Sequence, residues 1–128
     1  MQKIERFVMD SAVILNDFNF FFEENKIYYT TPEIINEIKD LRSRNLMESG
    51  LNQEYLIILD AKEKFLEKVK EKSKEKKLLK KLSAADLSIL ALALELKYPL
   101  ISDDFAIQSM CLQLKLSFLS VFRKKIKK

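Results

Sequence analysis

The sequence predicts an α/β fold with three layers, in which helices cover both faces of a central parallel sheet. Apolar strands alternate with helical segments along the chain, and this alternation is typical of a parallel sheet. Of the 128 residues, 48% are hydrophobic and 33% are charged, a balance that indicates a globular protein. No internal repeat or linker divides the chain, so we expect one domain over residues 1–122 and a basic tail over residues 123–128.

The first strand is predicted from a short apolar run near the N-terminus. Residues 6–9 form this run, which ends at Asp10. A short helix is expected to follow, with Asp10 or Ser11 as its cap. The four phenylalanines within residues 18–22 are expected to fill the core beside the sheet.

The middle of the chain is predicted to contain a second strand and two helices. Residues 27–30 are rich in β-forming residues and form the strand. The Thr-Pro-Glu sequence at residues 31–33 starts a helix, because a capping hydroxyl, an initial proline and an acid in the first turn coincide. This helix is expected to end at Leu41 or Arg44. A loop at Gly50 then leads to a long helical pattern over residues 53–81, either continuous or broken near Ser73.

The last third of the chain contains its most apolar helix. Ser83-x-x-Asp86 is a variant of the capping box and begins a helix over residues 84–97. Leucines and isoleucines lie around most of its circumference, so burial on several sides is predicted. After it we expect a strand at residues 100–102, a helix at 105–114 and a strand at 117–122.

The residue types that are missing exclude several classes of enzyme. The chain has no histidine, which excludes a Ser-His-Asp triad, a Cys-His pair and a histidine-ligated zinc site. The single cysteine, Cys111, excludes a zinc ribbon within the chain, and the single glycine excludes a P-loop. Carboxylates, lysines and hydroxyls remain, and such oxygen ligands favour Mg²⁺ or Mn²⁺.

Charge and hydropathy restrict the partners and the location. The formal net charge of +4 favours a polyanionic partner such as nucleic acid. No apolar run reaches the roughly 18 residues that a membrane-spanning helix needs, and the charged N-terminus predicts no signal peptide. Together with a cysteine that cannot form an internal disulfide, these features predict a cytoplasmic protein without a membrane partner.

Four carboxylates are expected to meet at one edge of the sheet. Asp10 and Asp104 each follow a predicted strand directly, and ligands of open parallel sheets bind beyond the carboxyl ends of the strands. Asp86 lies in the first turn of a helix that starts at this edge, and Glu37 flanks the apolar stripe of the second predicted helix. The sequence therefore predicts that these acids, with water, hold a divalent metal.

Each acid also has a purely structural interpretation. Asp10 can be a simple helix cap, and Glu37 can form a surface ion pair. For Asp86 and Asp104, taken one at a time, capping is the better explanation. The combination favours the metal site, because otherwise four unrelated acids would share one edge by coincidence.

Residues 62–81 carry a pattern rich in lysine and glutamate. Glutamates recur every four residues beside a row of lysines, which is typical of a solvated helix with ion pairs. The alternative is a surface that contacts the RNA backbone. In that case the best candidates for phosphate contacts are Lys76, Lys77, Lys80 and Lys81.

Four short motifs together resemble the PIN domain, a family of compact α/β nucleases. They are Val-Met-Asp-Ser at residues 8–11, Thr-Pro-Glu-Ile-Ile-Asn-Glu-Ile at 31–38, Leu-Ser-Ala-Ala-Asp at 82–86 and Ile-Ser-Asp-Asp-Phe at 101–105. Within the family, these segments and their extensions are most similar to the Nob branch. This branch comprises archaeal and eukaryotic endonucleases that mature the 3′ end of small-subunit rRNA.

The resemblance implies an endoribonuclease that hydrolyses single-stranded RNA with Mg²⁺ or Mn²⁺ and leaves a 5′-phosphate. By position, the catalytic acids would be Asp10, Glu37, Asp86 and Asp104. The three aspartates would bind the metal, and Glu37 would bind or orient the attacking water. Ser102 would supply a hydroxyl that holds the site or the phosphate, and the role of Asp103 is left open.

The same resemblance implies partners. The substrate would be precursor small-subunit rRNA, a ribosomal or assembly-factor protein could bind as well, and dimers are common among PIN domains. The Nob branch usually carries a zinc ribbon after its PIN domain, whereas this sequence has no cysteine cluster. Two alternatives stay open: a toxin ribonuclease of the VapC type that an antitoxin silences, and a non-catalytic PIN module that binds RNA or protein.

Overall fold

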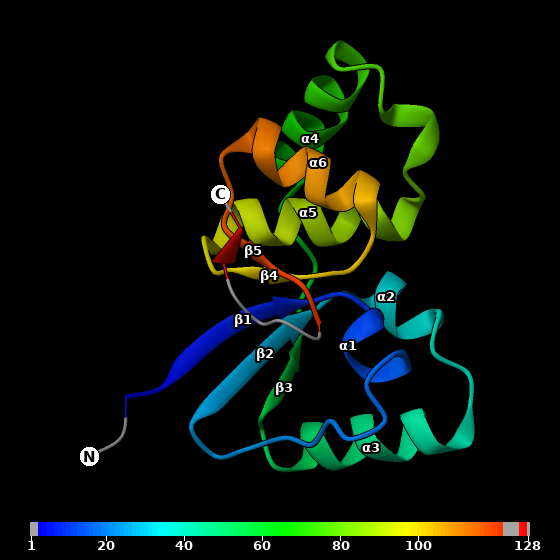
Figure 1. Cartoon of the computed structure of the whole chain (residues 1–128), viewed down its shortest axis with the longest axis vertical. Helices are drawn as coiled ribbons and strands as arrows, with labels where there is room; N and C mark the ends of the chain where they lie inside the picture. The colour runs from blue at the N-terminus through cyan, green and yellow to red at the C-terminus, as the bar shows by residue number, and fades with distance from the viewer. Residues whose placement is uncertain (1–2, 122–125, 128) are drawn as a thin grey trace.

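The protein is built on one six-stranded sheet in the order β3-β2-β1-β4-β5-β6 (Figure 1). This computed structural model describes residues 3–121 and 126–127. The strands are β1 Glu5–Met9, β2 Lys26–Thr30, β3 Leu56–Ile58, β4 Leu100–Ile101, β5 Phe118–Leu119 and β6 Ile126–Lys127. Strands β1 to β5 are parallel, and β6 is antiparallel to β5. The predicted α/β fold with a central parallel sheet is confirmed.

Helices cover both faces of the sheet, so the three predicted layers are present (Figure 1). The helices are α1 Ala12–Leu15, α2 Pro32–Asn36, α3 Leu41–Asn52, α4 Glu63–Glu75, α5 Ala84–Leu96 and α6 Phe105–Leu114, with a 3₁₀ turn, η1, at Leu79–Lys81. Helices α4, α5 and α6 pack on the face that carries Val8 and Leu100. Helices α1 and α3 pack on the face that carries Met9 and Ile101. Successive strand residues point to opposite faces, which explains the division.

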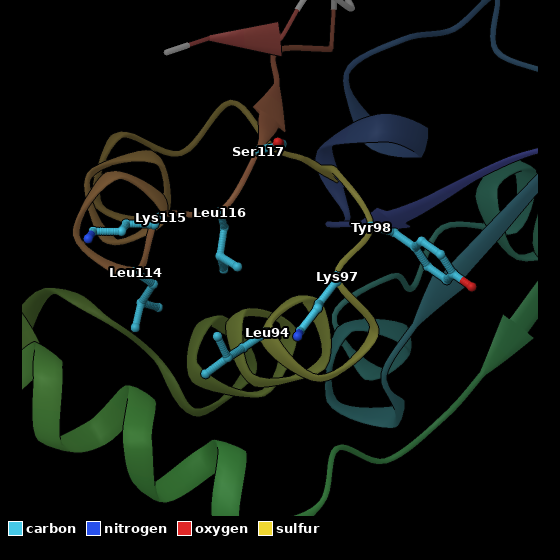
Figure 2. Close-up of a pocket in the computed structure, with 7 residues that line it drawn as sticks. All are labelled: Leu94, Lys97, Tyr98, Leu114, Lys115, Leu116 and Ser117. Carbon is cyan, nitrogen blue, oxygen red and sulfur yellow. The ribbon is translucent and has the colours of Figure 1, made fainter.

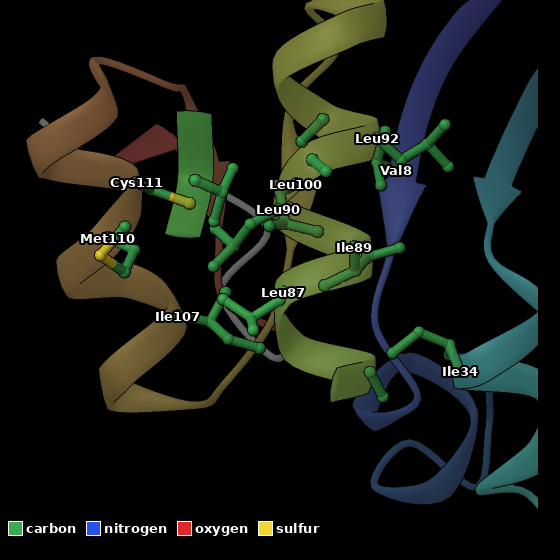
Figure 3. Close-up of a cluster of buried hydrophobic side chains, with 14 of the residues drawn as sticks. Val8, Ile34, Leu87, Ile89, Leu90, Leu92, Leu100, Ile107, Met110 and Cys111 are labelled. Atoms are coloured by element: carbon green, nitrogen blue, oxygen red, sulfur yellow. The ribbon is translucent and has the colours of Figure 1, made fainter. Parts of the chain in front are cut away.

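Helix α5 is the centre of the core, as its apolar circumference predicts. Figure 3 shows Leu87 and Leu90 directed towards α6, whereas Ile89 is directed towards β1. Full burial of side chains such as Ile89 and Leu90 stabilises the fold by roughly 1.5–3 kcal/mol each. The predicted capping box begins the helix: Ser83 Oγ accepts from Asp86 N at 3.0 Å, and Asp86 Oδ2 accepts from Ser83 N at 2.9 Å.

The predicted helix is confirmed only over α4, Glu63–Glu75, and is wrong for the rest of the range 53–81. Strand β3 lies within it and pairs with β2, with Ile57 opposite Tyr29, and α4 begins only at Glu63. A strand of three residues is too short to show its period beside a charged helical pattern. Pairing with a neighbouring strand decides the conformation of such a segment.

Gly50 lies inside α3 rather than in the predicted loop. A Cβ atom at this position would lie 2.6 Å from Cε2 of Phe22, so close packing of the ring explains the glycine. The expectation that the phenylalanines of residues 18–22 fill the core holds for Phe20, which is buried. It is wrong for Phe18 and Phe21, which are exposed.

The second predicted helix is shorter than expected and ends before the predicted Leu41. Helix α2 ends at Asn36, with Glu37 as its C-cap, and Asp40 then caps α3 by accepting from Ser43 N at 3.0 Å. The local hydrogen bond of Asp40 competes with a continuous helix, which is the usual effect of aspartate near a helix start.

The end of the chain also differs from the prediction. Strand β5 covers two residues rather than residues 117–122. Of the predicted tail over residues 123–128, residues 126–127 are described and form β6, and the domain boundary stays a prediction. Among residues 3–121 and 126–127, no helix has the length and apolarity that a membrane crossing needs.

Candidate active site

Asp10 and Ser102 meet where two central strands end. Strands β1 and β4 are neighbours with Met9 opposite Ile101, and Asp10 N donates a hydrogen bond to Ile101 O at 3.0 Å. The next residue along β4, Ser102, donates its hydroxyl to Asp10 Oδ2 at 2.8 Å. Ser11 N donates to Asp10 Oδ1 at 2.8 Å. Both carboxylate oxygens of Asp10 are therefore fixed in position.

Asp10 is the buried acid of this edge, with 6% of its surface exposed. Burial is the main reason that the pKa of Asp10 is raised from 3.8 to about 6. Hydrogen bonds from Ser102 and Ser11 lower the pKa, and the negative charges of Asp86 and Glu37 raise it. Asp86 and Glu37 thus lie close enough to act on Asp10, and a divalent cation would relieve both the burial and the repulsion at Asp10.

Glu37 reaches this group from the end of α2. Its Oε1 accepts a hydrogen bond from Ser11 Oγ at 3.4 Å, beside Asp10 in the chain. The bond is long and Glu37 is exposed, so its carboxylate can turn towards a bound water or cation. The end of α2 at Asn36 is what places Glu37 here.

Asp86 and Asp104 are both helix caps, as their structural interpretations predicted. Asp86 belongs to the capping box of α5, and its charge still acts on Asp10. Asp104 Oδ1 accepts from Ile107 N at 3.0 Å at the start of α6. Asp104 N donates to Ser102 Oγ at 3.1 Å, so one serine holds both Asp10 and the backbone of Asp104. Capping and a place at the shared edge are therefore compatible.

Asp103, for which the sequence left the role open, has a structural contact. Its Oδ1 accepts a hydrogen bond from Val121 N at 2.8 Å, just beyond β5. This bond fixes the loop that leads from β4 to α6. One oxygen of Asp103 is therefore engaged outside the group that surrounds Asp10.

Buried hydroxyls support the edge, and sequence reasoning missed most of them. Thr30 Oγ1 donates to Met9 O at 2.9 Å and joins the ends of β2 and β1. Thr31 Oγ1 lies 2.8 Å from Ser88 Oγ and links α2 to α5, and it also accepts from Ile34 N as the predicted cap. The available signal was a hydroxyl at a buried strand end and a serine inside an otherwise apolar helix.

The donors suit a hard divalent cation, although the acids do not form a closed cage. Within the described part of the chain, no three His, Cys, Asp or Glu side chains are grouped closely enough to hold a metal ion. Carboxylate and hydroxyl oxygens are the ligands that Mg²⁺ and Mn²⁺ prefer. Mg²⁺ commonly takes one or two carboxylates and keeps several waters, so an open group of acids fits it.

A lysine-lined hollow lies at the end of α4. It has a volume of about 400 Å³, and its lining residues are Lys74, Lys77, Leu79 and Lys80. Two of the predicted phosphate contacts, Lys77 and Lys80, therefore share it. Lys76 lies 4.0 Å from the carboxylate of Glu75, and Lys81 belongs to η1 but does not line the hollow. We call this feature the lysine hollow.

A second hollow lies at the amino ends of β4 and β5, on the side of the sheet opposite the acids and beside the ends of α5 and α6 (Figure 2). We call it the amino-edge hollow. It has a volume of about 260 Å³, and its lining residues are Leu94, Lys97, Tyr98, Leu114, Lys115, Leu116 and Ser117. Figure 2 shows Leu116 directed into the space and Tyr98 directed away from it. No carboxylate lines this amino-edge hollow, so it is separate from the acids.

Comparison with known proteins identifies the family. The family model described as PIN domain of ribonuclease matches residues 7–96, a range that contains Asp10, Glu37 and Asp86. An Endoribonuclease Nob1 of Pyrococcus abyssi is 34% identical over 118 residues, which are 92% of this chain and 70% of that protein. The chain belongs to the PIN-domain ribonucleases, of the Nob1 type.

Two further relatives bear on this PIN domain. An Endoribonuclease Nob1 of Methanocaldococcus jannaschii is 34% identical over 109 residues, 85% of this chain and 53% of that protein. A Ribonuclease VapC3 of Aeropyrum pernix is 33% identical over 92 residues, 68% of this chain and 66% of that protein. The Nob1 resemblance drawn from the four motifs is confirmed. The VapC alternative stays open, because one of the relatives is named Ribonuclease VapC3.

Proposed function

We propose that this PIN-domain endoribonuclease hydrolyses single-stranded RNA with the help of Mg²⁺ or Mn²⁺, and that its substrate is the 3′ end of precursor small-subunit rRNA. The observation that carries the proposal is the buried Asp10, whose pKa of about 6 reflects burial and two neighbouring acids. A buried carboxylate is costly unless a cation joins it. The relatives named Endoribonuclease Nob1 support RNA as the substrate, and the rRNA assignment rests on the motif resemblance.

The roles of the acids follow from how each one is held. Asp10, Asp86 and Asp104 would hold the metal, whose charge would make a water easier to deprotonate and would neutralise charge on the phosphate. Glu37 orients the attacking water, because among the described residues its side chain makes one hydrogen bond, which is long. The water gives up a proton and its oxygen bonds to phosphorus as the bond from phosphorus to the 3′ oxygen breaks. The 3′ oxygen takes up a proton and leaves as a hydroxyl, so the other product carries a 5′-phosphate. Ser102 positions Asp10 for this step.

The lysines supply the attraction that the acids cannot. A group of acids repels RNA, so cations beside the site must bind its backbone. Lys77 and Lys80 of the lysine hollow are the main candidates, and Lys76 and Lys81 would add contacts nearby. The segment that carries them leads directly through η1 into the capping box at Asp86. Binding through such contacts should weaken as the salt concentration rises.

Cleavage of an end-labelled RNA that spans a small-subunit 3′ boundary tests the proposal. The assay compares Mn²⁺ with EDTA, and the wild type with Asp10→Asn. Asp103→Asn is the matched control, because the carboxylate of Asp103 accepts a hydrogen bond from Val121 N, away from the group around Asp10. We expect the wild type and Asp103→Asn to cut at the boundary with Mn²⁺, and the Asp10→Asn variant to be inactive.

The other outcomes separate the parts of the proposal. Metal-dependent cutting at scattered sites would keep the nuclease and remove the rRNA assignment. Cutting in EDTA, or undiminished cutting by the Asp10→Asn variant, would contradict the catalytic site. RNA binding without any cutting would leave the non-catalytic module.

The VapC3 relative supports a second candidate, a toxin ribonuclease. Both candidates share the acids and the metal but differ in their effect on cells. Expression of a toxin should arrest growth, and a small antitoxin encoded beside it should restore growth, whereas an rRNA-processing enzyme should do neither. A ribosomal or assembly-factor partner, a homodimer and a cytoplasmic location stay predictions.

A further inference from the structure

Phe105 is a large apolar side chain that the fold leaves in solvent beside the candidate active site. It is the first residue of α6 and follows Asp104 directly. Its exposed fraction is 81%, the highest among the large hydrophobic residues that the structure describes. Single exposed apolar residues are common on protein surfaces, so its position and surroundings decide whether it has a role.

The ring of Phe105 is mostly exposed and has no aromatic or cationic partner among the described residues. Phe18 is similarly exposed, at 76%, but the guanidinium of Arg42 lies 4.7 Å from the centre of its ring. None of the ring-ring or cation-ring contacts within the described residues involves Phe105. A flat apolar surface is thus available beside Asp104.

The backbone that carries Phe105 is anchored to the same serine as the acids. Asp104 caps α6 through Ile107 N, and Ile107 is fully buried. The side chain of Gln108 donates to Ser102 O at 2.8 Å, while Asp104 N donates to Ser102 Oγ. The start of α6 is therefore held against the end of β4, which fixes the ring's attachment point relative to the acids.

We propose that Phe105 is a stacking platform for one unpaired nucleobase of the RNA whose backbone enters the acidic site. The proposal rests on the proposed function and adds the means by which the site recognises a single strand. Aromatic side chains stack on any nucleobase, because every base has a π-face, and a base inside a duplex is not available for this contact. Phe105 therefore favours single-stranded RNA with little preference for sequence.

A binding assay that varies both the ring and the base tests the platform. Binding is measured by fluorescence anisotropy with Mg²⁺, in an Asp10→Asn background that prevents cleavage. One probe is octaadenylate, and the other is an octamer of tetrahydrofuran phosphates, which carries the same backbone charge without bases. Leu112→Ala is the control variant, because Leu112 is 53% exposed near the other end of α6.

We expect Phe105→Ala to weaken binding of octaadenylate by roughly 5- to 150-fold, the range typical of one base stacked on an aromatic ring. Binding of the base-free octamer should not change. Phe105→Trp should retain tight binding of octaadenylate, and Leu112→Ala should leave both affinities unchanged.

Three results would overturn the platform. Unchanged octaadenylate binding by Phe105→Ala would show that the ring makes no contact with the base. An equal loss with both octamers would show that Phe105 acts on the backbone or on the fold. If the Asp10→Asn parent bound neither octamer and the wild type with Mg²⁺ neither bound nor cut octaadenylate, the proposed RNA function would fail together with the platform, whereas the first two results would leave that function intact.

Discussion

The two edges of the sheet differ in what they bury. At the carboxyl edge, Asp10 is buried with both oxygens hydrogen-bonded, and the hydroxyls of Ser102 and Thr30 are buried beside the strand ends. At the amino edge, leucines line the amino-edge hollow together with Lys97 and Lys115 (Figure 2). The first edge gathers acids, whereas none of the described residues that line the amino-edge hollow is an acid.

This difference shows that unfavourable burial, rather than concavity, identifies the candidate site. An apolar hollow between helix ends needs no functional explanation, because the leucines that line it also contribute to packing. A buried carboxylate destabilises the fold unless a partner neutralises it. Substitutions at the carboxyl edge should therefore change activity or pH-dependent stability, whereas matched substitutions at the amino-edge hollow should not.

Asp86→Asn should lower the activity sharply and leave the fold intact. The amide oxygen can still accept the hydrogen bond from Ser83 N, so α5 remains capped, but the negative charge is lost. We expect RNA cleavage to fall by more than about 100-fold, beyond the loss typical of residues that only support metal ligands. The free energy of unfolding, measured with urea, should stay within about 0.5 kcal/mol of the wild type.

Ser83→Ala is the reverse control for that experiment. It removes the hydroxyl that caps α5 and should lower the free energy of unfolding by about 1 kcal/mol while cleavage persists. Equal losses of activity in the two variants would mean that Asp86 acts through the cap alone.

Asp10→Asn should stabilise the metal-free protein at neutral pH. The folded-state pKa of about 6 lies above the usual 3.8, so the folded protein binds the proton more tightly than the unfolded chain. The buried negative charge of Asp10 therefore lowers the free energy of unfolding. This loss is absent below the unfolded-state pKa, grows as the pH rises through the unfolded-state and folded-state pKa values, and reaches about 3 kcal/mol at most. Urea unfolding in EDTA should show the gain at about pH 7.5 and little change at about pH 4. If the gain in the free energy of unfolding were equal at the two pH values, burial of the Asp10 charge could not be the cause of the gain.

Ser102→Ala should reduce activity by weakening the hold on Asp10. Removing a group that orients a metal ligand typically costs about 10- to 100-fold in affinity or activity. We expect a loss of that size in Mn²⁺-dependent kcat/KM, partly recovered at high Mn²⁺ concentration. Ser117→Ala, at the amino-edge hollow, is the matched control and should retain full activity.

The smallest effect is expected from the lysine hollow. The double variant Lys77→Gln with Lys80→Gln should bind single-stranded RNA more weakly. The slope of log affinity against log salt should fall by about 1.4, since each lost phosphate contact on a single strand contributes about 0.7. Lys97→Gln with Lys115→Gln removes the same charge at the amino-edge hollow and should leave the slope unchanged. An equal change in both variants would indicate a general charge effect.

The sequence predicted the layers of the fold and the capping roles of Asp86 and Asp104, because both depend on local signals. Apolar runs mark the strand ends that carry Asp10 and Ser102, and the capping box marks the start of α5. Strand β3 was missed because three residues show no period, and only pairing with β2 makes them a strand.

The remaining features depend on contacts between distant residues. Gly50 lies in α3 at the point where the ring of Phe22 packs against the helix, which leaves no room for a side chain. The sequence gives no sign of this contact. The contact between Thr31 and Ser88 joins residues 57 positions apart, and the bond from Val121 N to Asp103 gives a structural role that spacing could not assign.

Binding of Mn²⁺ to the metal-free protein, measured by isothermal titration calorimetry, tests the central claim most directly. The comparison includes the wild type, Asp10→Asn and the control Asp103→Asn. If the acids of the carboxyl edge form a metal centre, the wild type and the Asp103→Asn variant should show saturable binding that the Asp10→Asn variant lacks. Equal binding by all three proteins, or no binding by the wild type, would contradict the claim.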